Sequence, residues 1–196
     1  MPTHRKRILS APVWAGDFYV DQNDLGASDQ NSGSVGQPWR TIAKANSTLV
    51  AGDTVYIKAG TYGDTTIAPV HSGTSEGKRI TYRNSENDVV VISNAATQSV
   101  GLRLDARSYI TVHGINFTQQ HRFLYIRDGS SNNTIAYCNF DDAKLTDGAV
   151  ATWAGSVITG SSQHNWIHHC RFSKYGYYNA DDKGCVLDIG SESMRL

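Results

Sequence analysis

The segment SSQHNWIHHCRFS (161–173) gathers His164, His168, His169 and Cys170 within seven positions. Imidazole nitrogen and thiolate sulfur are the ligands that zinc and copper prefer in proteins. Taken alone, the segment therefore suggests a transition-metal site. Whether these side chains can share one ion depends on the elements that carry them.

Two further segments, 141–155 and 174–184, mix carboxylates, lysines and aromatic rings. The carboxylates are Asp141, Asp142, Asp147, Asp181 and Asp182, the lysines are Lys144, Lys174 and Lys183, and the rings are Trp153, Tyr175, Tyr177 and Tyr178. Calcium takes several carboxylate oxygens from flexible loops, and flat rings offer apolar faces to sugars. A lysine serves as a base when burial or nearby cations lower its pKa. Each residue singly is typical of a solvated loop, but together they favour a surface for acidic polysaccharide.

The elements that must position these residues are short strands. One stretch, 41–49, has helical spacing, with Ile42, Ala45 and Leu49 on one face after Thr41. The rest consists of brief apolar runs separated by Gly, Asn, Asp and Ser. This pattern is typical of a β-rich protein with many turns.

Four segments repeat one pattern, namely 101–117, 123–140, 156–172 and 185–196. Each opens with an apolar-x-apolar strand and a polar turn, and the first three then end on Phe117, Phe140 and Phe172. Equivalent positions lie 23 and then 32 residues apart, and the extra residues follow each Phe. Fixed strands with loops inserted at one corner indicate a solenoid.

Three short strands per repeat predict an all-β fold, the right-handed parallel β-helix. Earlier strands are expected within 54–60, 79–84 and 89–93. The helix at 41–49 is then expected to cap the first coil, because an open sheet edge invites aggregation.

Alternation along the first strand of each unit predicts which side chains point outward. These are Arg103, Tyr125, Ile158 and Asp188, between inward neighbours such as Leu102 and Leu104. We expect Arg103 and Tyr125 to contact substrate, together with the rings of the two loops. Trp153, Tyr175, Tyr177 and Tyr178 complete that set.

Composition limits the function. The 196 residues suit one domain, with 1–16 as a disordered or signal-like tail and 17–196 as the solenoid. Lys plus Arg and Asp plus Glu both number 18, so the net charge of zero gives no basis for binding nucleic acid or an anionic membrane. No apolar run approaches the roughly 20 residues that span a bilayer. The odd number of cysteines, three, predicts no disulfide framework.

The fourth unit stops at residue 196, after its first strand and turn. We therefore expect the chain to be part of a longer solenoid, or a partner to cover its last coil.

The stretches DFYVDQNDLGASDQNSGSVGQPWRTIAKA, GDTVYIKAGTY, SGTSEGKRITYRN and DVVVI resemble the opening of right-handed parallel β-helix proteins of the pectate-lyase-like superfamily. The similarity is greatest to polysaccharide lyase family 9 and related bacterial proteins, and covers roughly residues 17–140 well. It implies an extracellular protein that cleaves uronate-containing polysaccharide by calcium-assisted β-elimination. The resemblance also implies aspartates that hold the ion and a lysine that removes a proton.

The family's ligand pattern has no residue-by-residue match here, so we assign roles from loop composition. Lys183 or Lys174 is the expected base, and the expected Ca²⁺ ligands are Asp181, Asp182, Asp141 and Asp142. The alternative is a non-catalytic β-helix for glycan binding, adhesion or surface display.

Aligned with its sister repeats, the histidine segment becomes one rung of the solenoid. His168 and His169 correspond to Ala136 and Tyr137 at a two-residue corner, and Cys170 is expected to point inward. A metal site there is accordingly the least favoured of the three hypotheses.

Overall fold

The computed structural model describes residues 15–96, 99–143, 155–173, 187–189 and 194–195. Its strands form three sheets, and within each sheet the neighbouring strands run parallel. Sheet 1 contains β1 (Asp17–Val20), β2 (Thr54–Ile57), β4 (Ile80–Asn84), β7 (Ile110–His113), β10 (Thr134–Ala136), β13 (Asn165–His168) and β16 (Met194–Arg195). Sheet 2 contains β3 (Gly60–Tyr62), β5 (Val90–Ser93), β8 (Ile115–Thr118), β11 (Asn139–Asp141) and β14 (Arg171–Ser173). Sheet 3 contains β6 (Val100–Asp105), β9 (Arg122–Arg127), β12 (Gly155–Ile158) and β15 (Leu187–Ile189).

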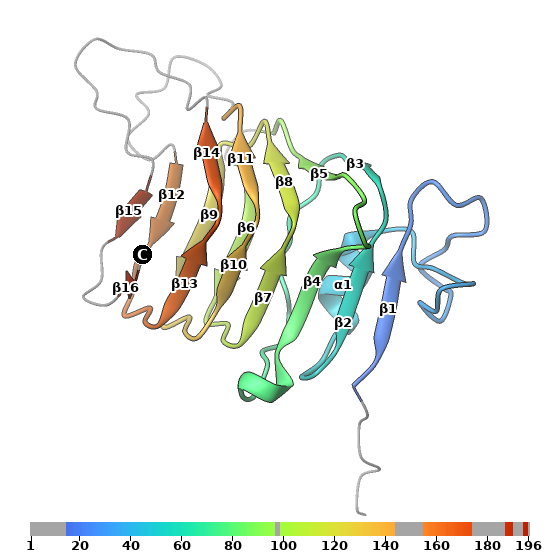
Figure 1. Ribbon diagram of the computed structural model, residues 1–196, viewed down its shortest axis with the longest axis horizontal. Coiled ribbons are helices and arrows are strands. Elements are labelled where there is room, and N and C mark those ends of the chain that lie inside the picture. The colour runs from blue at the N-terminus through green and yellow to red at the C-terminus, as the bar shows by residue number, and fades with distance from the viewer. Residues whose placement is uncertain (1–14, 97–98, 144–154, 174–186, 190–193, 196) are drawn as a thin grey trace, which may run out of the picture.

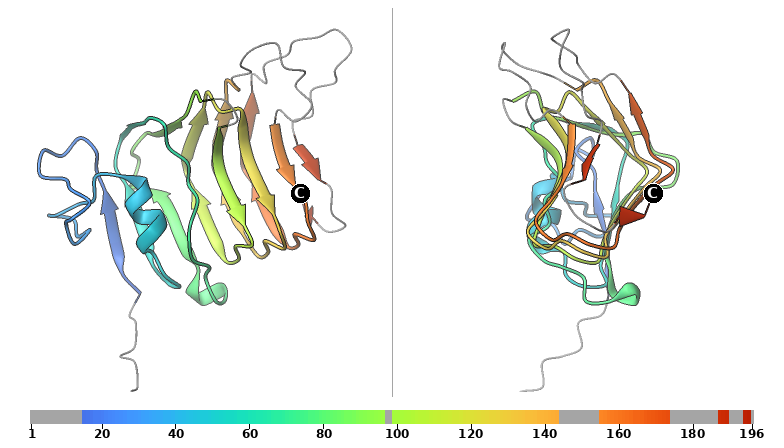
Figure 2. Two further views of the ribbon diagram at one scale, coloured as in Figure 1. Left: turned by 180° about the vertical axis from the view of Figure 1, so that it is seen from behind. Right: turned by 90° about the vertical axis from the view of Figure 1, so that its left-hand side faces the viewer.

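Each later coil visits sheet 3, sheet 1 and sheet 2 in turn, as β6, β7 and β8 do. The strands stack side by side along the long axis (Figure 1), and the end-on view shows them enclosing one core (Figure 2). The parallel solenoid expected from the repeats is therefore confirmed, including the strands in 54–60, 79–84 and 89–93.

The short helix α1 (Ile42–Thr48) also forms where its spacing predicts. Thr41 caps it, accepting a hydrogen bond from the backbone N–H of Lys44 at 3.2 Å. Asn46 bonds to the backbone of 66–68, and Ile67 bridges to β6. The helix thus continues the row of sheet 3 toward the N-terminal end (Figure 2, left). A short 3₁₀ turn, η1 (Glu76–Lys78), lies before β4.

The core is built of ladders of like residues. Phe117, Phe140 and Phe172 stack with ring centroids 5.0 and 4.7 Å apart. Because parallel strands lie about 4.8 Å apart, residues in register meet at stacking distance. The repeated Phe therefore fixes the register of sheet 2, and through it the outward side chains of each coil.

Polar groups inside the turns between sheet 3 and sheet 1 also form a ladder. Buried Asn133 accepts the N–H of Ile110 at 2.9 Å and donates to Asn165 Oδ1 at 2.8 Å. Asn165 in turn donates to the Ser130 carbonyl at 2.9 Å. Since unpaired buried amides are costly, these contacts hold β7, β10 and β13 in one alignment.

One expectation about orientation is wrong. Ile158 was predicted to point outward, but it pairs with Ile126 and is only 1% exposed. A register irregularity between Gly155 and Val157 shifts the strand by one residue, so Val157 pairs with Tyr125. A one-residue shift exchanges the two faces of a strand, which explains the error.

Candidate functional site

The outer face of sheet 3 carries charged and aromatic side chains from β6 and β9. In register, Arg103 lies beside Tyr125 and Asp105 lies beside Arg127. The structure therefore brings together Arg103 and Tyr125, the two strand residues expected to contact substrate.

Asp105 is the centre of this group. It accepts hydrogen bonds from Arg103 Nε at 2.6 Å and from Arg127 Nε at 2.7 Å. Partial burial raises the pKa of Asp105, but the bonds from both guanidinium groups outweigh this and hold its pKa below the usual value. The hydrogen bond to Asp105 also raises the pKa of Arg127. Asp105 and Arg127 therefore stay charged at neutral pH.

Two guanidinium groups lie near the ring of Tyr125. The guanidinium carbons of Arg127 and Arg122 lie 4.9 and 5.4 Å from its ring centroid. The Arg103 side chain is 45% exposed, and among the described residues its Nε donates to Asp105. The partly exposed guanidinium lies in register beside the tyrosine. We call Arg103, Asp105, Arg122, Tyr125 and Arg127 the arginine face.

This arrangement suits an anionic ligand with a ring. A guanidinium group fixed at Nε presents parallel N–H donors that match a carboxylate. An adjacent tyrosine ring offers a flat apolar contact. Asp188, also expected to point outward, pairs in register with Val157 and so falls in the same column as Tyr125.

The loop residues expected to complete the site lie outside the described residues. They are Lys144, Asp147, Trp153, Lys174, Tyr175, Tyr177, Tyr178, Asp181, Asp182 and Lys183.

Asp141 and Asp142 are described, and they lie at another face. Asp141 ends β11 on sheet 2, where its Oδ1 accepts a hydrogen bond from Ser173 Oγ at 2.8 Å. With Arg171 it lines a hollow of about 350 Å³. Asp142 follows at an exposed bend. Among residues with described positions, no three His, Cys, Asp or Glu side chains are placed to hold a metal ion.

The histidine segment forms part of one regular coil of the solenoid. His168 pairs in register with Ala136, and His169 takes the bend with φ 53°. The two Nδ1 atoms lie 2.7 Å apart, and Cys170 packs against the core, so the cysteine is turned away from the histidine pair. The alignment of His168 with Ala136 is confirmed.

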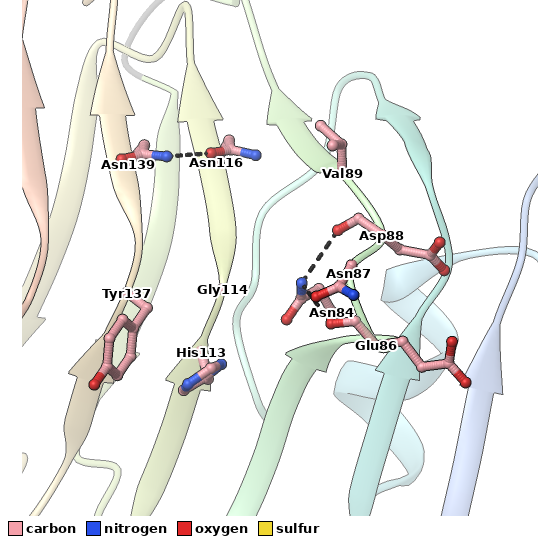
Figure 3. Close-up of a pocket in the computed structure, with 10 residues that line it drawn as sticks. All are labelled: Asn84, Glu86, Asn87, Asp88, Val89, His113, Gly114, Asn116, Tyr137 and Asn139. Carbon is pink, nitrogen blue, oxygen red and sulfur yellow. Dashed lines mark hydrogen bonds between the residues drawn. The ribbon is translucent and has the colours of Figure 1, made fainter.

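Sequence reasoning missed a second hollow, which lies at the corner between sheet 1 and sheet 2 (Figure 3). It measures about 650 Å³, and we call it the corner groove. Its lining residues are Asn84, Glu86, Asn87, Asp88, Val89, His113, Gly114, Asn116, Tyr137 and Asn139. One signal could have found it, because Gly114 stands where the next two repeats carry Tyr137 and His169.

The stacked parallel coils define a β-helix protein. The sequence model of the family described as Pel9A-like, right handed beta helix region, matches residues 18–190, and the chain belongs to this family. The resemblance drawn from the N-terminal motifs is thus confirmed, as is the right-handed fold. In the part of the chain that the structure describes, no helix is long and apolar enough to cross a membrane.

Known proteins share parts of the chain. The uncharacterized protein YwoF of Bacillus subtilis (strain 168) is 42% identical over 107 residues, covering 52% of this chain and 22% of that protein. A rhamnogalacturonan lyase structure has 17% identity and a TM-score of 0.54, covering 88% of this chain and 53% of that one. The GH136 lacto-N-biosidase from Eubacterium ramulus has 14% identity and a TM-score of 0.55, covering 81% and 30%.

The chain matches only part of each of these proteins. The chain spans about half the length of the lyase and about a fifth to a third of the other two proteins. At 14–17% identity, the two structures share the fold with this chain.

Proposed function

We propose that the protein is a carbohydrate-active β-helix module, the N-terminal part of a lyase that acts on uronate-containing polysaccharide. The observation that carries the proposal is the arginine face, where the partly exposed Arg103 lies in register beside Tyr125. Membership of the Pel9A-like family and a fold shared with a rhamnogalacturonan lyase support it. Because polysaccharides of this kind lie outside cells, an extracellular location is part of the proposal.

Arg103 would bind the uronate carboxylate through two parallel hydrogen bonds, with the sugar ring against Tyr125. Pairing the carboxylate with a cation eases removal of the proton from the carbon beside it. A base then takes that proton, the electron pair forms a C=C bond, and the C–O bond to the next sugar breaks. The leaving oxygen keeps the electron pair of the broken C–O bond and takes a proton from water. Lys183 or Lys174 is the proposed base.

The described residues alone do not fit a calcium ion. Asp141 and Asp142 supply two carboxylates, and Asp141 is already bonded to Ser173. Calcium takes six to eight oxygen ligands. Binding of Ca²⁺ is therefore proposed only with the added help of Asp181 and Asp182, and the role of the arginine face does not depend on it.

The test is turnover and binding of polygalacturonate, alginate and glycosaminoglycan, with and without calcium. We expect ultraviolet absorbance from an unsaturated product, and binding about tenfold weaker in Arg103→Ala, since hydrogen bonds to charged groups contribute about 1.5–3 kcal/mol before solvent screening. Lys78→Ala is the matched control, because it removes one exposed positive charge from η1. Equal binding by both variants would refute the proposed role of the arginine face.

A second candidate is a β-helix that binds such glycans without cleaving them. It is favoured by the makeup of the arginine face, which among the described residues contains ligand-binding groups and no lysine. Binding without product, unchanged in Lys183→Ala, would select this alternative over the lyase.

A further inference from the structure

The corner groove lies on a different face from the arginine face and has a different chemistry. Figure 3 shows its two walls, the turn 85–89 on one side and Tyr137 with Asn139 on the other. Gly114 and His113 lie between them. Neighbouring strands are about 4.8 Å apart, so walls two strands apart leave room for one sugar-sized ring.

The groove exists because one ring is missing from a stack. Tyr137 stacks on His169 with centroids 4.8 Å apart and an interplanar angle of 16°. At the same corner of the preceding coil stands Gly114, with φ 70°. A Cβ at this position would overlap the side-chain amide of Asn84. The gap above Gly114 therefore leaves Tyr137 at the end of the stack, 53% exposed beside the tilted ring of His113.

Hydrogen bonds fix the opposite wall in place. Asn84 Nδ2 donates to the carbonyls of Glu86 and Asp88 at 3.3 and 3.1 Å, which holds the turn in one conformation. Asn116 Nδ2 donates to the Val90 carbonyl at 3.0 Å. The groove is thus a formed surface, with its side-chain anchors already bonded to the backbone.

Other polar groups of the groove remain turned to solvent. Asn139 Nδ2 donates to Asn116 Oδ1 at 2.6 Å, while Asn139 Oδ1 has no partner within the described residues. The carboxylates of Glu86 and Asp88, in contrast, point away from Tyr137 and Asn139 (Figure 3). The amide oxygen of Asn139 is an acceptor, which suits a ligand with hydroxyl donors.

Charge excludes the ligand class proposed for the arginine face. The lining of the groove contains two carboxylates and neither lysine nor arginine. A uronate would meet repulsion and find no cation with which to pair. The suitable ligand is uncharged, carries several hydroxyl groups and has an apolar ring face.

We propose that the corner groove binds a neutral sugar residue, with its ring against Tyr137 and a hydroxyl group bonded to Asn139. The inference does not rest on the proposed function, because the two sites lie on different sheets and take ligands of different charge. In a polysaccharide with both kinds of sugar, the groove would contact its uncharged residues or branches.

The experiment is nuclear magnetic resonance titration of the full chain with three classes of probe and a blank. These are neutral glucose-, galactose- and mannose-based oligosaccharides, oligogalacturonate, calcium chloride alone, and buffer. We expect a neutral oligosaccharide to shift the side-chain amide signals of Asn116 and Asn139. Tyr137→Ala should weaken that binding about fivefold to tenfold, since it removes the ring contact.

Trp166→Ala is the matched control, because Trp166 is 51% exposed on sheet 1 and lies outside the groove lining. It should leave the binding of neutral sugar unchanged, as should Arg103→Ala. Asn139→Leu, which removes the acceptor, gives a second test that does not depend on the aromatic ring. Three outcomes would overturn the proposal: no shift with any neutral probe, shifts from calcium alone, or oligogalacturonate binding equally well at these amides.

Discussion

The arginine face and the corner groove are built from the same coils, yet they present opposite charge. The first places three guanidinium groups around Asp105 and Tyr125. The second places Glu86 and Asp88 beside amides and a ring, with neither lysine nor arginine in the lining. One solenoid can therefore offer separate faces to ligands of different charge.

The contrast shows two ways in which a repeat makes a surface. On a strand, residues in register are about 4.8 Å apart, so like charges repel unless an opposite charge separates them. Asp105 has that role between Arg103 and Arg127. At the corner, by contrast, a side chain is missing at Gly114, and the hollow results from a break in the ladder.

The largest effect is expected from a substitution in the aromatic core, which supports both surfaces. Phe140 is fully buried and stacks between Phe117 and Phe172. Phe140→Ala should lower the free energy of unfolding by about 3–5 kcal/mol, the usual cost of emptying such a site. Urea denaturation measures this change, and binding at both surfaces should weaken together.

Phe140→Leu is the milder comparison, because it keeps most of the apolar volume. If Phe140→Ala lowered stability by less than about 1 kcal/mol, the aromatic ladder would not be the common support of the two surfaces.

The next largest effect should change ligand binding at one surface and leave the other unchanged. Gly114→Ala places a side chain at φ 70° and against Asn84. Left-handed backbone costs an L-residue about 1–2 kcal/mol, and displacing Asn84 releases the turn that forms the groove wall. We expect loss of neutral-sugar binding with oligogalacturonate binding retained. Gly63→Ala is the control, since a Cβ there meets no neighbour; equal effects of the two variants would contradict the account.

Most of the fold could be predicted from the sequence because the core repeats. The Phe positions, the apolar pairs and the turn residues recur in the later coils and predicted the strands correctly, while helical spacing predicted the helix at 41–49. The failure at Ile158 arose where the repeat itself is irregular. A bulge leaves no composition signal, so counting alternate residues from the wrong start placed this side chain on the wrong face.

The candidate sites were predictable to different degrees. Arg103 and Tyr125 are polar residues between inward neighbours, so strand alternation alone put them together. The corner groove depends on the turn 85–89 and on Gly114, which have no counterpart in the later repeats. Its walls are adjacent only because coils stack, and residues 84 and 137 are not related by any local pattern.

A smaller effect distinguishes the surfaces by their electrostatics. Raising salt from about 0.05 to 0.5 M shortens the Debye length to roughly 4 Å and screens exposed charges. We expect oligogalacturonate binding at the arginine face to weaken about tenfold and neutral-sugar binding to stay constant. Isothermal titration at several salt concentrations measures both. Neutral-sugar binding that fell in parallel would show that the groove ligand is held by charge.

The smallest effect is on stability as pH changes, and it differs between the two regions. Burial, then the charge of Arg83 and then His168 lower the pKa of His113, whose ring also lies beside Tyr137. A histidine with a lowered folded pKa binds fewer protons when folded, so stability rises with pH up to its unfolded pKa of about 6.5. Asp105 has a lowered carboxyl pKa, so its contribution is present above about pH 3.9 and is lost as pH falls through the folded value.

Acidification should therefore affect the groove first. Between about pH 7 and 5, we expect unfolding free energy to fall by under roughly 1 kcal/mol, and His113→Gln to reduce that slope. The stabilising contribution of the arginine face should be lost only at lower pH, as Asp105 becomes protonated. Asp105→Asn should abolish this pH-dependent loss. His71→Gln controls for losing an exposed imidazole. If His113→Gln left the slope between pH 5 and 7 intact, the groove histidine would not be the group that titrates first, because His121 and His168 also have lowered pKa values.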